Sequence, residues 1–448
     1  MQKNEYLEGK CIDYTHDAQG VVKIDNFPVF VKGLLLDEVA KIKIIKVVKN
    51  YAIGRLIEII ERSPYRCEPK CPLFIQCGGC HIQHLTVEGQ QAFKTKRIND
   101  TLKRIGHCDV EVLPCLMMDE SWYYRNKVQV PVGFQKNKIV TGFYKQHTND
   151  IIPMETCYIQ NDESNLLVKR VKELLIQVGE IPYDKVKRVG NIRHILVKSA
   201  HTTKELMLVL ITSKNNVKGM EMIKETLVKE FPHLTSIVHN INKRYDNVIL
   251  GHENRTLYGN GYIEDVLLGN TYRISTQSFY QVNPIQVETL YKKAIEFADF
   301  KKDDIVIDAY CGIGTIALSL AQYVNKVYGV EVIQQAVKDA KQNAKRNHIE
   351  NVEFACQDAG DFMIEFAEKD IKVDVVMIDP PRKGCSPLFL EQLLTLSPDK
   401  IVYISCDVAT QARDIAYLQE NGYKADICQP VDMFPQSHHI ESIVRLSK

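Results

Sequence analysis

The sequence predicts a multidomain α/β protein with three parts: a small OB-like N-terminal β-barrel, a central α+β domain with a cysteine cluster, and a C-terminal Rossmann-like domain. Three observations support this fold class. Short alternating segments fill the first 60 residues, a cluster of cysteines follows in the next part of the chain, and strands alternate with helices from about residue 272. A chain of 448 residues is longer than one ordinary domain, so we place domains at 1–60, 61–270 and 271–448.

The bulk composition limits the class of protein. With 45% apolar and 25% charged residues, the chain matches a soluble globular protein. No apolar stretch approaches the roughly 18 residues of a membrane span, and the polar N-terminus leads into no secretory signal. Thirteen cysteines indicate a reducing compartment, so we expect a cytoplasmic protein without membrane partners. The net charge of +1 means that any nucleic-acid-binding surface must gather its positive charge locally.

The first 60 residues show the period of two that is typical of half-buried strands. Val21–Ile24 and Val29–Val31 flank a turn, and residues 39–48 alternate apolar residues with lysines. Short strands at this spacing predict a small barrel. The lysines either contact RNA or form a solvated strand face, and the sequence leaves both interpretations open.

The central part combines thiols, basic residues and aromatic residues. A basic helix is predicted over residues 90–107, and three aromatic residues at 122–124 precede Arg125. Backbone contacts with RNA are expected from the basic residues at 41–49 and 94–104, and from four further cations. These four are Arg125, Lys127, Lys187 and Arg188. The aromatic rings either stack on bases or belong to the core.

The C-terminal part contains the pattern of a nucleoside-binding site. An apolar strand at 305–308 runs into the turn Gly312-Ile-Gly314, where glycine lets a ligand approach the backbone. The next strand ends at Glu331, which can accept hydrogen bonds from both ribose hydroxyls. The turn lacks the spacing that cradles a pyrophosphate, which favours a methyltransferase. Asp358 can read an adenine amino group, and Asp379-Pro-Pro places a carboxylate beside the cofactor.

Two further residues supply the chemistry for methylating carbon 5 of uracil. Cys406 follows a strand at the same edge of the sheet, and Glu441 precedes the last strand. Carbon 5 becomes nucleophilic only after a thiolate adds to carbon 6, and a base must then remove the proton from carbon 5. We expect Cys406 to be the nucleophile and Glu441 the base.

Together these residues resemble the RNA 5-methyluridine (uracil-C5) methyltransferases, in the TRAM-domain, iron–sulfur branch that acts on 23S rRNA. The resemblance spans nearly the whole chain, and Gln281-Val-Asn-Pro, Asp379-Pro-Pro-Arg and Ser405-Cys406 are specific in combination. It implies a TRAM barrel, S-adenosylmethionine as cofactor and structured RNA as partner. The implied cofactor contacts are Gln281, Tyr310, Glu331, Asp358 and Asp379.

The resemblance also implies a [4Fe–4S] cluster with a structural or RNA-positioning role. Its implied ligands are Cys71, Cys77, Cys80 and Cys157, which leaves Cys67 free. A zinc site that includes Cys67 is the alternative, because closely spaced thiolates also suit tetrahedral zinc. One departure from the family is Asp407, which follows Cys406 and is expected to raise the pKa of the thiol.

Three alternatives accompany this prediction, which takes the protein to be a monomer. The first keeps the reaction and changes the substrate to the T-loop uridine of tRNA. The second is a non-catalytic iron–sulfur RNA-binding protein, against which both Cys406 and Glu441 argue. The third, an amino-directed methyltransferase, is rejected because such enzymes need an aromatic residue after the two prolines, where Arg382 stands.

Overall fold

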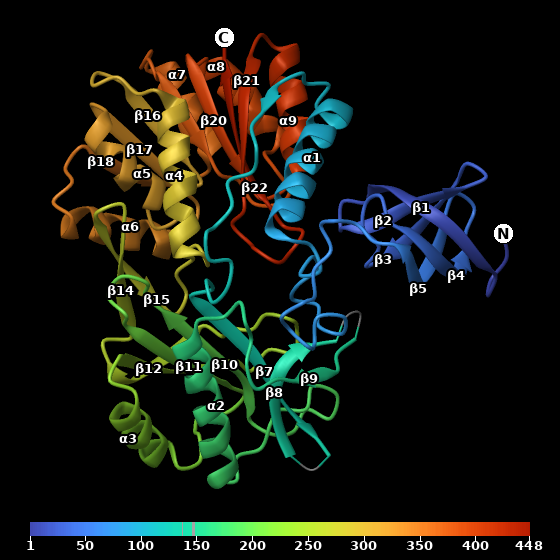
Figure 1. The fold of residues 1–448 in the computed structure, drawn as a ribbon. Coiled ribbons are helices and arrows are strands. Elements are labelled where there is room, and N and C mark those ends of the chain that lie inside the picture. The colour runs from blue at the N-terminus through green and yellow to red at the C-terminus, as the bar shows by residue number, and fades with distance from the viewer. Residues whose placement is uncertain (137, 146–147) are drawn as a thin grey trace.

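The N-terminal unit is a closed five-stranded barrel. The computed structural model describes residues 1–136, 138–145 and 148–448, and Figure 1 shows the barrel beside the other two units. The strands pair in the order β1-β2-β3-β5-β4, and alternate residues such as Val29, Val31, Ile42 and Ile44 fill its core. The strands are β1 (Tyr6–Tyr14), β2 (Gln19–Ile24), β3 (Phe27–Lys32), β4 (Val39–Val47) and β5 (Ala52–Glu61).

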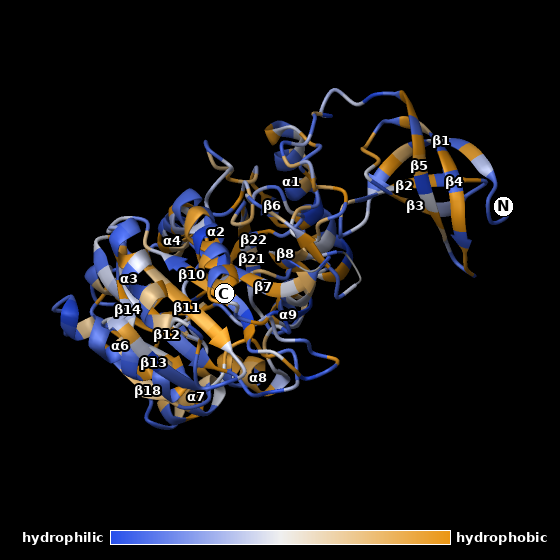
Figure 2. Ribbon diagram, turned by 90° about the horizontal axis from the view of Figure 1, so that it is seen from below, coloured by the Kyte–Doolittle hydropathy of each residue, from blue (hydrophilic) through white to orange (hydrophobic). Residues whose placement is uncertain are grey.

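The central unit is a seven-stranded sheet in the order β13-β12-β11-β10-β7-β8-β9. Its strands are β7 (Lys127–Gln135), β8 (Lys138–Tyr144), β9 (Ile151–Pro153), β10 (Ile192–Ser199), β11 (Leu206–Thr212), β12 (Leu234–Ile241) and β13 (Glu253–Gly259). Its helices are α2 (Asp162–Gln177) and α3 (Met220–Glu230), and a separate hairpin consists of β14 (Tyr262–Leu267) and β15 (Asn270–Ser275). Figure 2 shows β11 as hydrophobic along its length, because both faces of this strand are covered. Leu208 and Leu210 share a core with the two helices, whereas Met207 and Val209 pack with the hairpin.

The C-terminal unit is an eight-stranded sheet in the order β18-β17-β16-β19-β20-β22-β21-β6. Its strands are β6 (Glu111–Val112), β16 (Ile305–Ala309), β17 (Lys326–Glu331), β18 (Val352–Cys356), β19 (Val375–Ile378), β20 (Lys400–Ser405), β21 (Lys424–Val431) and β22 (Glu441–Ser447). Its helices are α4 (Pro284–Ala298), α5 (Thr315–Leu320), η1 (Ala321–Tyr323), α6 (Gln334–Arg346), α7 (Ala359–Glu368), α8 (Pro387–Leu396) and α9 (Val408–Glu420). The first five strands in sheet order are parallel, as predicted, while β22 runs antiparallel between β20 and β21.

Helices cover both faces of this sheet. One core contains residues of α4, α5 and α6, and the other contains residues of α7, α8 and α9 together with Ile98 and Leu102 of α1 (Val87–Ile105). The segment 87–118, which the sequence prediction placed in the central domain, therefore lies against the C-terminal sheet. Its strand β6 pairs with β21. The apolar stripe of α1 is buried against α9.

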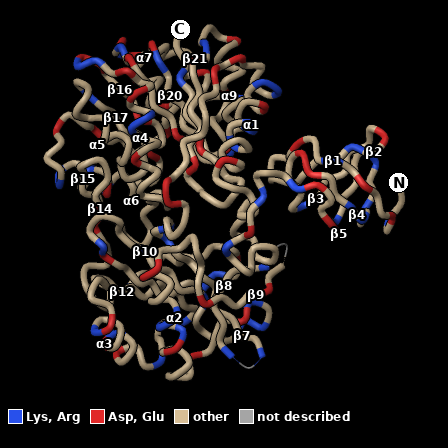
Figure 3. The backbone as a smooth tube through the Cα atoms, in the orientation of Figure 1, with Lys and Arg blue, Asp and Glu red and all other residues tan. Residues whose placement is uncertain are grey.

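Charge is spread over all three units. Figure 3 shows lysine and arginine interspersed with aspartate and glutamate along the whole chain, in keeping with the net charge of +1. Among the helices that the structure describes, none combines the length and apolar character needed to cross a bilayer.

Candidate active site

The glycine turn after β16 is built for close approach of a ligand. Gly314 has a φ of +83°, and a Cβ there would lie 2.8 Å from Cζ of Phe354. Gly312 has a φ of +55°, but a Cβ at this position would meet no described atom within 4 Å. Thus Gly314 is required by packing, whereas Gly312 faces open space. Asp308 supports the turn, since its Oδ2 accepts a hydrogen bond from the Ala317 backbone N–H at 2.8 Å.

Glu331, at the end of β17, is held against this turn. Its Oε2 accepts a hydrogen bond from the Gly312 N–H at 3.2 Å, and its Oε1 accepts one from the Ile333 N–H at 2.9 Å. Both bonds fix the carboxylate at the carboxyl edge of the sheet. This is the edge at which ligands bind in open α/β sheets.

Two more of the predicted cofactor residues lie around the same edge. Tyr310 is half-buried with a φ of +66°, and its ring centroid is 5.3 Å from that of Phe389. Asp358 is exposed and caps α7, accepting a hydrogen bond from the Gly360 N–H at 2.8 Å. Its charge is close enough to contribute to the raised pKa of Tyr310.

The Gln-Val-Asn-Pro motif joins the central and C-terminal units. Asn283 accepts from the Gln286 N–H at 3.1 Å and so caps α4, in which Pro284 occupies the first turn. The carbonyl of Gln281 accepts a hydrogen bond from Nδ2 of Asn126 at 3.0 Å. Gln281 is half-buried, so its backbone position is set by both units.

Cys406, Asp379, Arg382 and Glu441 form one electrostatic group. Cys406 is half-buried and directly follows β20, and the Arg382 side chain acts on its thiol. Burial, Glu441 and Asp379 raise the pKa of Cys406 to about 12, while Arg382 opposes them. Burial raises the pKa of Asp379 to about 7. Burial and Asp379 raise the pKa of Glu441 well above its usual value, so the resting site holds three protonatable acids beside one cation.

The pKa of Cys406 is raised, as the sequence predicted, but Asp407 is not the cause. The causes are burial, Glu441 and Asp379. Asp407 instead caps α9, because its Oδ1 accepts hydrogen bonds from the N–H groups of Ala409 and Thr410 at 3.1 and 3.2 Å. The residue that departs from the family pattern therefore has a structural role at a helix N-terminus.

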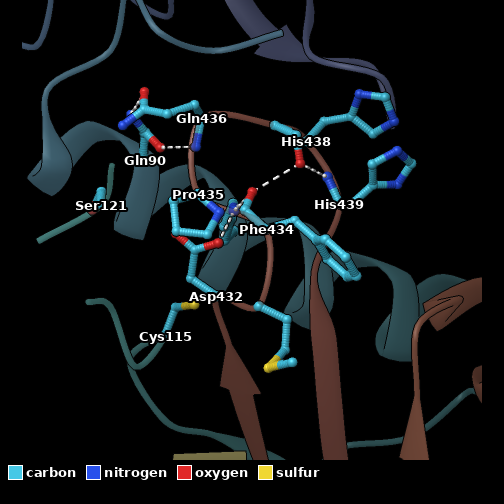
Figure 4. A network of polar contacts seen from close by, with 12 residues as sticks. Gln90, Cys115, Ser121, Asp432, Phe434, Pro435, Gln436, His438 and His439 are labelled. Carbon is cyan, nitrogen blue, oxygen red and sulfur yellow. Dashed lines mark hydrogen bonds and ion pairs between the residues drawn. The ribbon is translucent and has the colours of Figure 1, made fainter. Parts of the chain in front are cut away.

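The loop 432–440, which leads into Glu441, is held mainly by α1. Figure 4 shows this network. The fully buried side chain of Lys94 pairs with Asp432, which is also fully buried. Gln90 accepts from the Gln436 N–H at 3.2 Å, and Arg97 donates to a carbonyl at the far end of the loop. Glu441 is thus positioned by contacts from a helix that lies far away in the chain, 338 residues in the case of Lys94 and Asp432.

Two expected RNA contacts are corrected by this network. Lys94 is buried and neutralises Asp432, so it does not face RNA. Tyr124 is 5% exposed, and its hydroxyl donates to the Pro435 carbonyl at 3.1 Å, so it does not stack on a base. Sequence analysis missed Gln90, although its place on the same helical face as Lys94 was a usable signal.

The four cysteines of the implied cluster line one cavity of about 280 Å³. Three of these thiols, at Cys71, Cys77 and Cys157, contribute to the raised pKa of Cys80, which is about 12 chiefly because of burial. Cys67 is outside the cavity, and its Sγ donates to the Gln83 carbonyl at 3.4 Å. The donor set therefore fits an iron–sulfur group better than a zinc site that needs Cys67. Over residues 1–136, 138–145 and 148–448, no three His, Cys, Asp or Glu side chains already form a metal-binding group.

Cations near this cavity lie over aromatic rings. Lys70 Nζ is 5.0 Å from the ring centroids of both Trp122 and Tyr123, while Arg125 and Lys127 line the cavity itself. Trp122 and Tyr123 are half-buried. These five residues place positive charge and aromatic surface together, as RNA-binding surfaces require.

Comparison with known proteins identifies the family. A family model described as tRNA (Uracil-5-)-methyltransferase matches residues 88–448, and a TRAM domain model matches residues 12–57. A relative from Bacillus cereus, described as an uncharacterized RNA methyltransferase, is 44% identical over 449 residues, which cover 100% of this chain and 98% of the relative. A Listeria monocytogenes relative with the same description is 45% identical over 446 residues, with coverage of 100% and 98%.

A solved structure resembles the whole chain. The tRNA (uracil-54, C5)-methyltransferase of Pyrococcus abyssi, in complex with S-adenosyl-L-homocysteine, has a TM-score of 0.77 and 25% identity. The match covers 98% of this chain and 99% of that enzyme. Fold and site thus define an S-adenosylmethionine-dependent RNA uracil-5-methyltransferase. The chain belongs to the tRNA (uracil-5-)-methyltransferase family and carries a TRAM domain, which confirms the predicted family and fold class.

Proposed function

We propose that this protein methylates carbon 5 of a uridine in 23S rRNA through a covalent adduct between Cys406 and carbon 6. The observation that carries the covalent route is the grouping of a thiol, two carboxyls and one guanidinium at the edge of the sheet where the cofactor site lies. Such a group contains a nucleophile, acceptors for two protons and a cation for developing negative charge.

The chain's own residues account for each proton. Cys406 loses its proton as the bond between sulfur and carbon 6 forms, and Asp379 is the neighbouring carboxyl that is ionised above a pKa of about 7. The electron pair of the 5,6 double bond moves toward oxygen 4, which makes carbon 5 nucleophilic. After methylation Glu441 takes the proton from carbon 5, and the bond between sulfur and carbon 6 breaks. Arg382 lowers the pKa of Glu441 and so favours its basic form.

The cofactor is assigned to the edge that contains the glycine turn. S-adenosylmethionine supplies an electrophilic methyl group. Glu331 would accept hydrogen bonds from the ribose hydroxyls, and Asp358 would accept one from the adenine amino group. Tyr310 and Asp379 directly follow β16 and β19, and together with Gln281 they would complete the contacts.

The cysteine cavity is assigned to a [4Fe–4S] cluster with Cys71, Cys77, Cys80 and Cys157 as ligands. The support is that all four thiols line one cavity while Cys67 does not. Zinc bound by thiols of this cavity is the alternative. The cluster would hold the surrounding chain, since the transfer of a methyl cation requires no electron.

The T-loop uridine of tRNA is the second candidate substrate. The Pyrococcus abyssi enzyme is a tRNA (uracil-54, C5)-methyltransferase, and the match covers 98% of this chain, so the barrel and the central unit do not by themselves favour rRNA. The class of RNA must therefore be measured directly.

The deciding experiment uses isotopically labelled S-adenosylmethionine with unmodified 23S rRNA and unmodified tRNA, followed by mass spectrometry of nucleosides. Labelled 5-methyluridine in rRNA alone supports the proposal. Labelled 5-methyluridine in tRNA alone would show that the substrate is tRNA and not rRNA. Cys406→Ala should abolish transfer and retain RNA binding, whereas Cys356→Ala, at an exposed cysteine of the same unit, should leave transfer intact.

The covalent route has a separate test. Glu441→Gln should accumulate an RNA–protein adduct that survives denaturing electrophoresis, because the carbon 5 proton is then not removed. The adduct should be absent from Cys406→Ala/Glu441→Gln. Efficient methylation by the Cys406→Ala variant would eliminate the covalent route.

A further inference from the structure

Three histidine rings gather on one side of the loop 432–440. The ring centroid of His438 is 4.2 Å from that of His81 and 4.3 Å from that of His439, with interplanar angles of 51° and 44°. The two segments are joined because the N–H groups of His81 and Ile82 donate to the Gln436 carbonyl at 2.9 and 3.1 Å. Figure 4 shows the His438 and His439 rings side by side, pointing away from Gln90.

These rings lie between the barrel and the nucleophile. The charges of Asp17 and Lys32, both in the barrel unit, act on His81. On the other side, Arg382 acts on both His439 and Cys406. A strand of RNA that contacts both the barrel and Cys406 would therefore pass over the histidines.

The chemistry of the rings suits a nucleobase. All three are half-buried, and burial is the first cause that lowers the pKa of His438 to about 3 and of His439 to about 4, so both are neutral at neutral pH. Neutral imidazole presents a flat face for stacking. Within the described part of the chain, Nδ1 of His81, Nδ1 of His438 and Nε of Arg97 are buried without a hydrogen-bond partner, so the histidine cluster contains unsatisfied polar atoms. The same described residues form no metal-binding group here.

We propose that His81, His438 and His439 form a stacking platform for a nucleobase of the RNA strand that carries the target uridine. The inference rests on the proposed function, because it takes RNA as the substrate. The platform holds the strand while the target uridine, unstacked from its neighbours, reaches Cys406.

The test measures the affinity of the full-length protein for an unmodified RNA transcript, either 23S rRNA or tRNA, whichever the wild-type enzyme methylates. His438→Ala and His81→Ala should each weaken binding roughly 5- to 150-fold, the range for loss of one base–aromatic stack. His438→Phe should restore binding, since stacking needs the ring and not its nitrogens. His233→Ala is the matched control, because His233 is remote and pairs with Glu163 at 3.0 Å.

Folding is monitored by melting temperature and by the affinity for S-adenosylmethionine, and His81→Ala remains available if the His438 variant does not fold. Alanine variants that bind RNA as tightly as wild type overturn the platform while leaving the methylation result untouched. The platform is equally overturned if His438→Phe binds as weakly as His438→Ala. A wild-type protein that binds no RNA overturns the proposed function itself.

Discussion

Replacing Lys94 by methionine should destabilise the protein and impair methyl transfer together. Lys94 and Asp432 both have fully buried side chains and form an ion pair. Removing one partner of such a pair costs about 3–5 kcal/mol, because the other charge is left buried without compensation. That is a large share of the roughly 5–15 kcal/mol that stabilises a typical domain.

The size of the effect should depend on pH. Burial already raises the pKa of Asp432, and Lys94 lowers it, so the variant should raise it further. At pH 8 the carboxyl of the variant must either stay charged in the core or take up a proton at a cost. At pH 5 it takes up the proton more easily. The loss of stability should therefore be larger at pH 8 than at pH 5.

The assay is urea unfolding at both pH values, combined with the initial rate of methyl transfer. Lys103→Met is the matched control, because Lys103 lies on the same helix and is exposed. Lys94→Met/Asp432→Leu should recover most of the stability, since no unpaired charge remains. A loss below about 1 kcal/mol, or one equal to that of Lys103→Met, would refute the assignment of the pair as the anchor of the loop.

Three further outcomes are expected. Asp379→Asn should raise the melting temperature at pH 8 but not at pH 4. The pKa of Asp379 is about 7 in the folded protein and 3.8 in the unfolded chain, so the wild-type protein loses stability as pH rises between these values, by at most about 4 kcal/mol. A gain in melting temperature that is equal at both pH values would contradict this. Gly314→Ala and Gly312→Ala both place a Cβ at a positive φ, but Gly314→Ala should lower the melting temperature more, because its Cβ would also lie 2.8 Å from Phe354. Gly312→Ala should in addition weaken S-adenosylmethionine binding measured by calorimetry; equal effects on stability would falsify the division of roles. Tyr124→Phe should cost about 1 kcal/mol in urea unfolding through loss of one buried hydrogen bond, and an unchanged midpoint would show that the bond is not formed.

Local patterns predicted the strands around the proposed cofactor site well. The strands predicted to end at Glu331 and just before Cys406 do so in β17 and β20. Each is an apolar run that stops at a polar residue, so the sequence contains both its location and its end. The antiparallel direction of β22 has no such local signal, because it depends on which neighbours the last strand meets.

Burial of charge was the part that sequence reasoning could not predict. Lys94 belongs to a basic helix, where lysine is almost always exposed, and its partner Asp432 lies 338 residues further along the chain. Tyr124 stands beside Arg125, as a base-stacking residue would, yet its hydroxyl bonds to a distant carbonyl. In both cases a long-range contact decides the role of a residue whose local context suggests a surface.

These buried contacts hold the loop that leads into the group formed by Cys406, Asp379, Arg382 and Glu441. Cys406, Asp379 and Glu441 each have a raised pKa, and Arg382 is the cation that opposes this rise for Cys406 and Glu441. With a pKa raised to about 12, Cys406 is a thiol in the resting site, so no exposed thiolate is left to react with other electrophiles. In the proposed mechanism, this thiol loses its proton as the bond to carbon 6 forms. Two buried carboxyls that repel each other keep their positions only if the surrounding chain is rigid. The contacts between α1 and the loop 432–440 supply that rigidity.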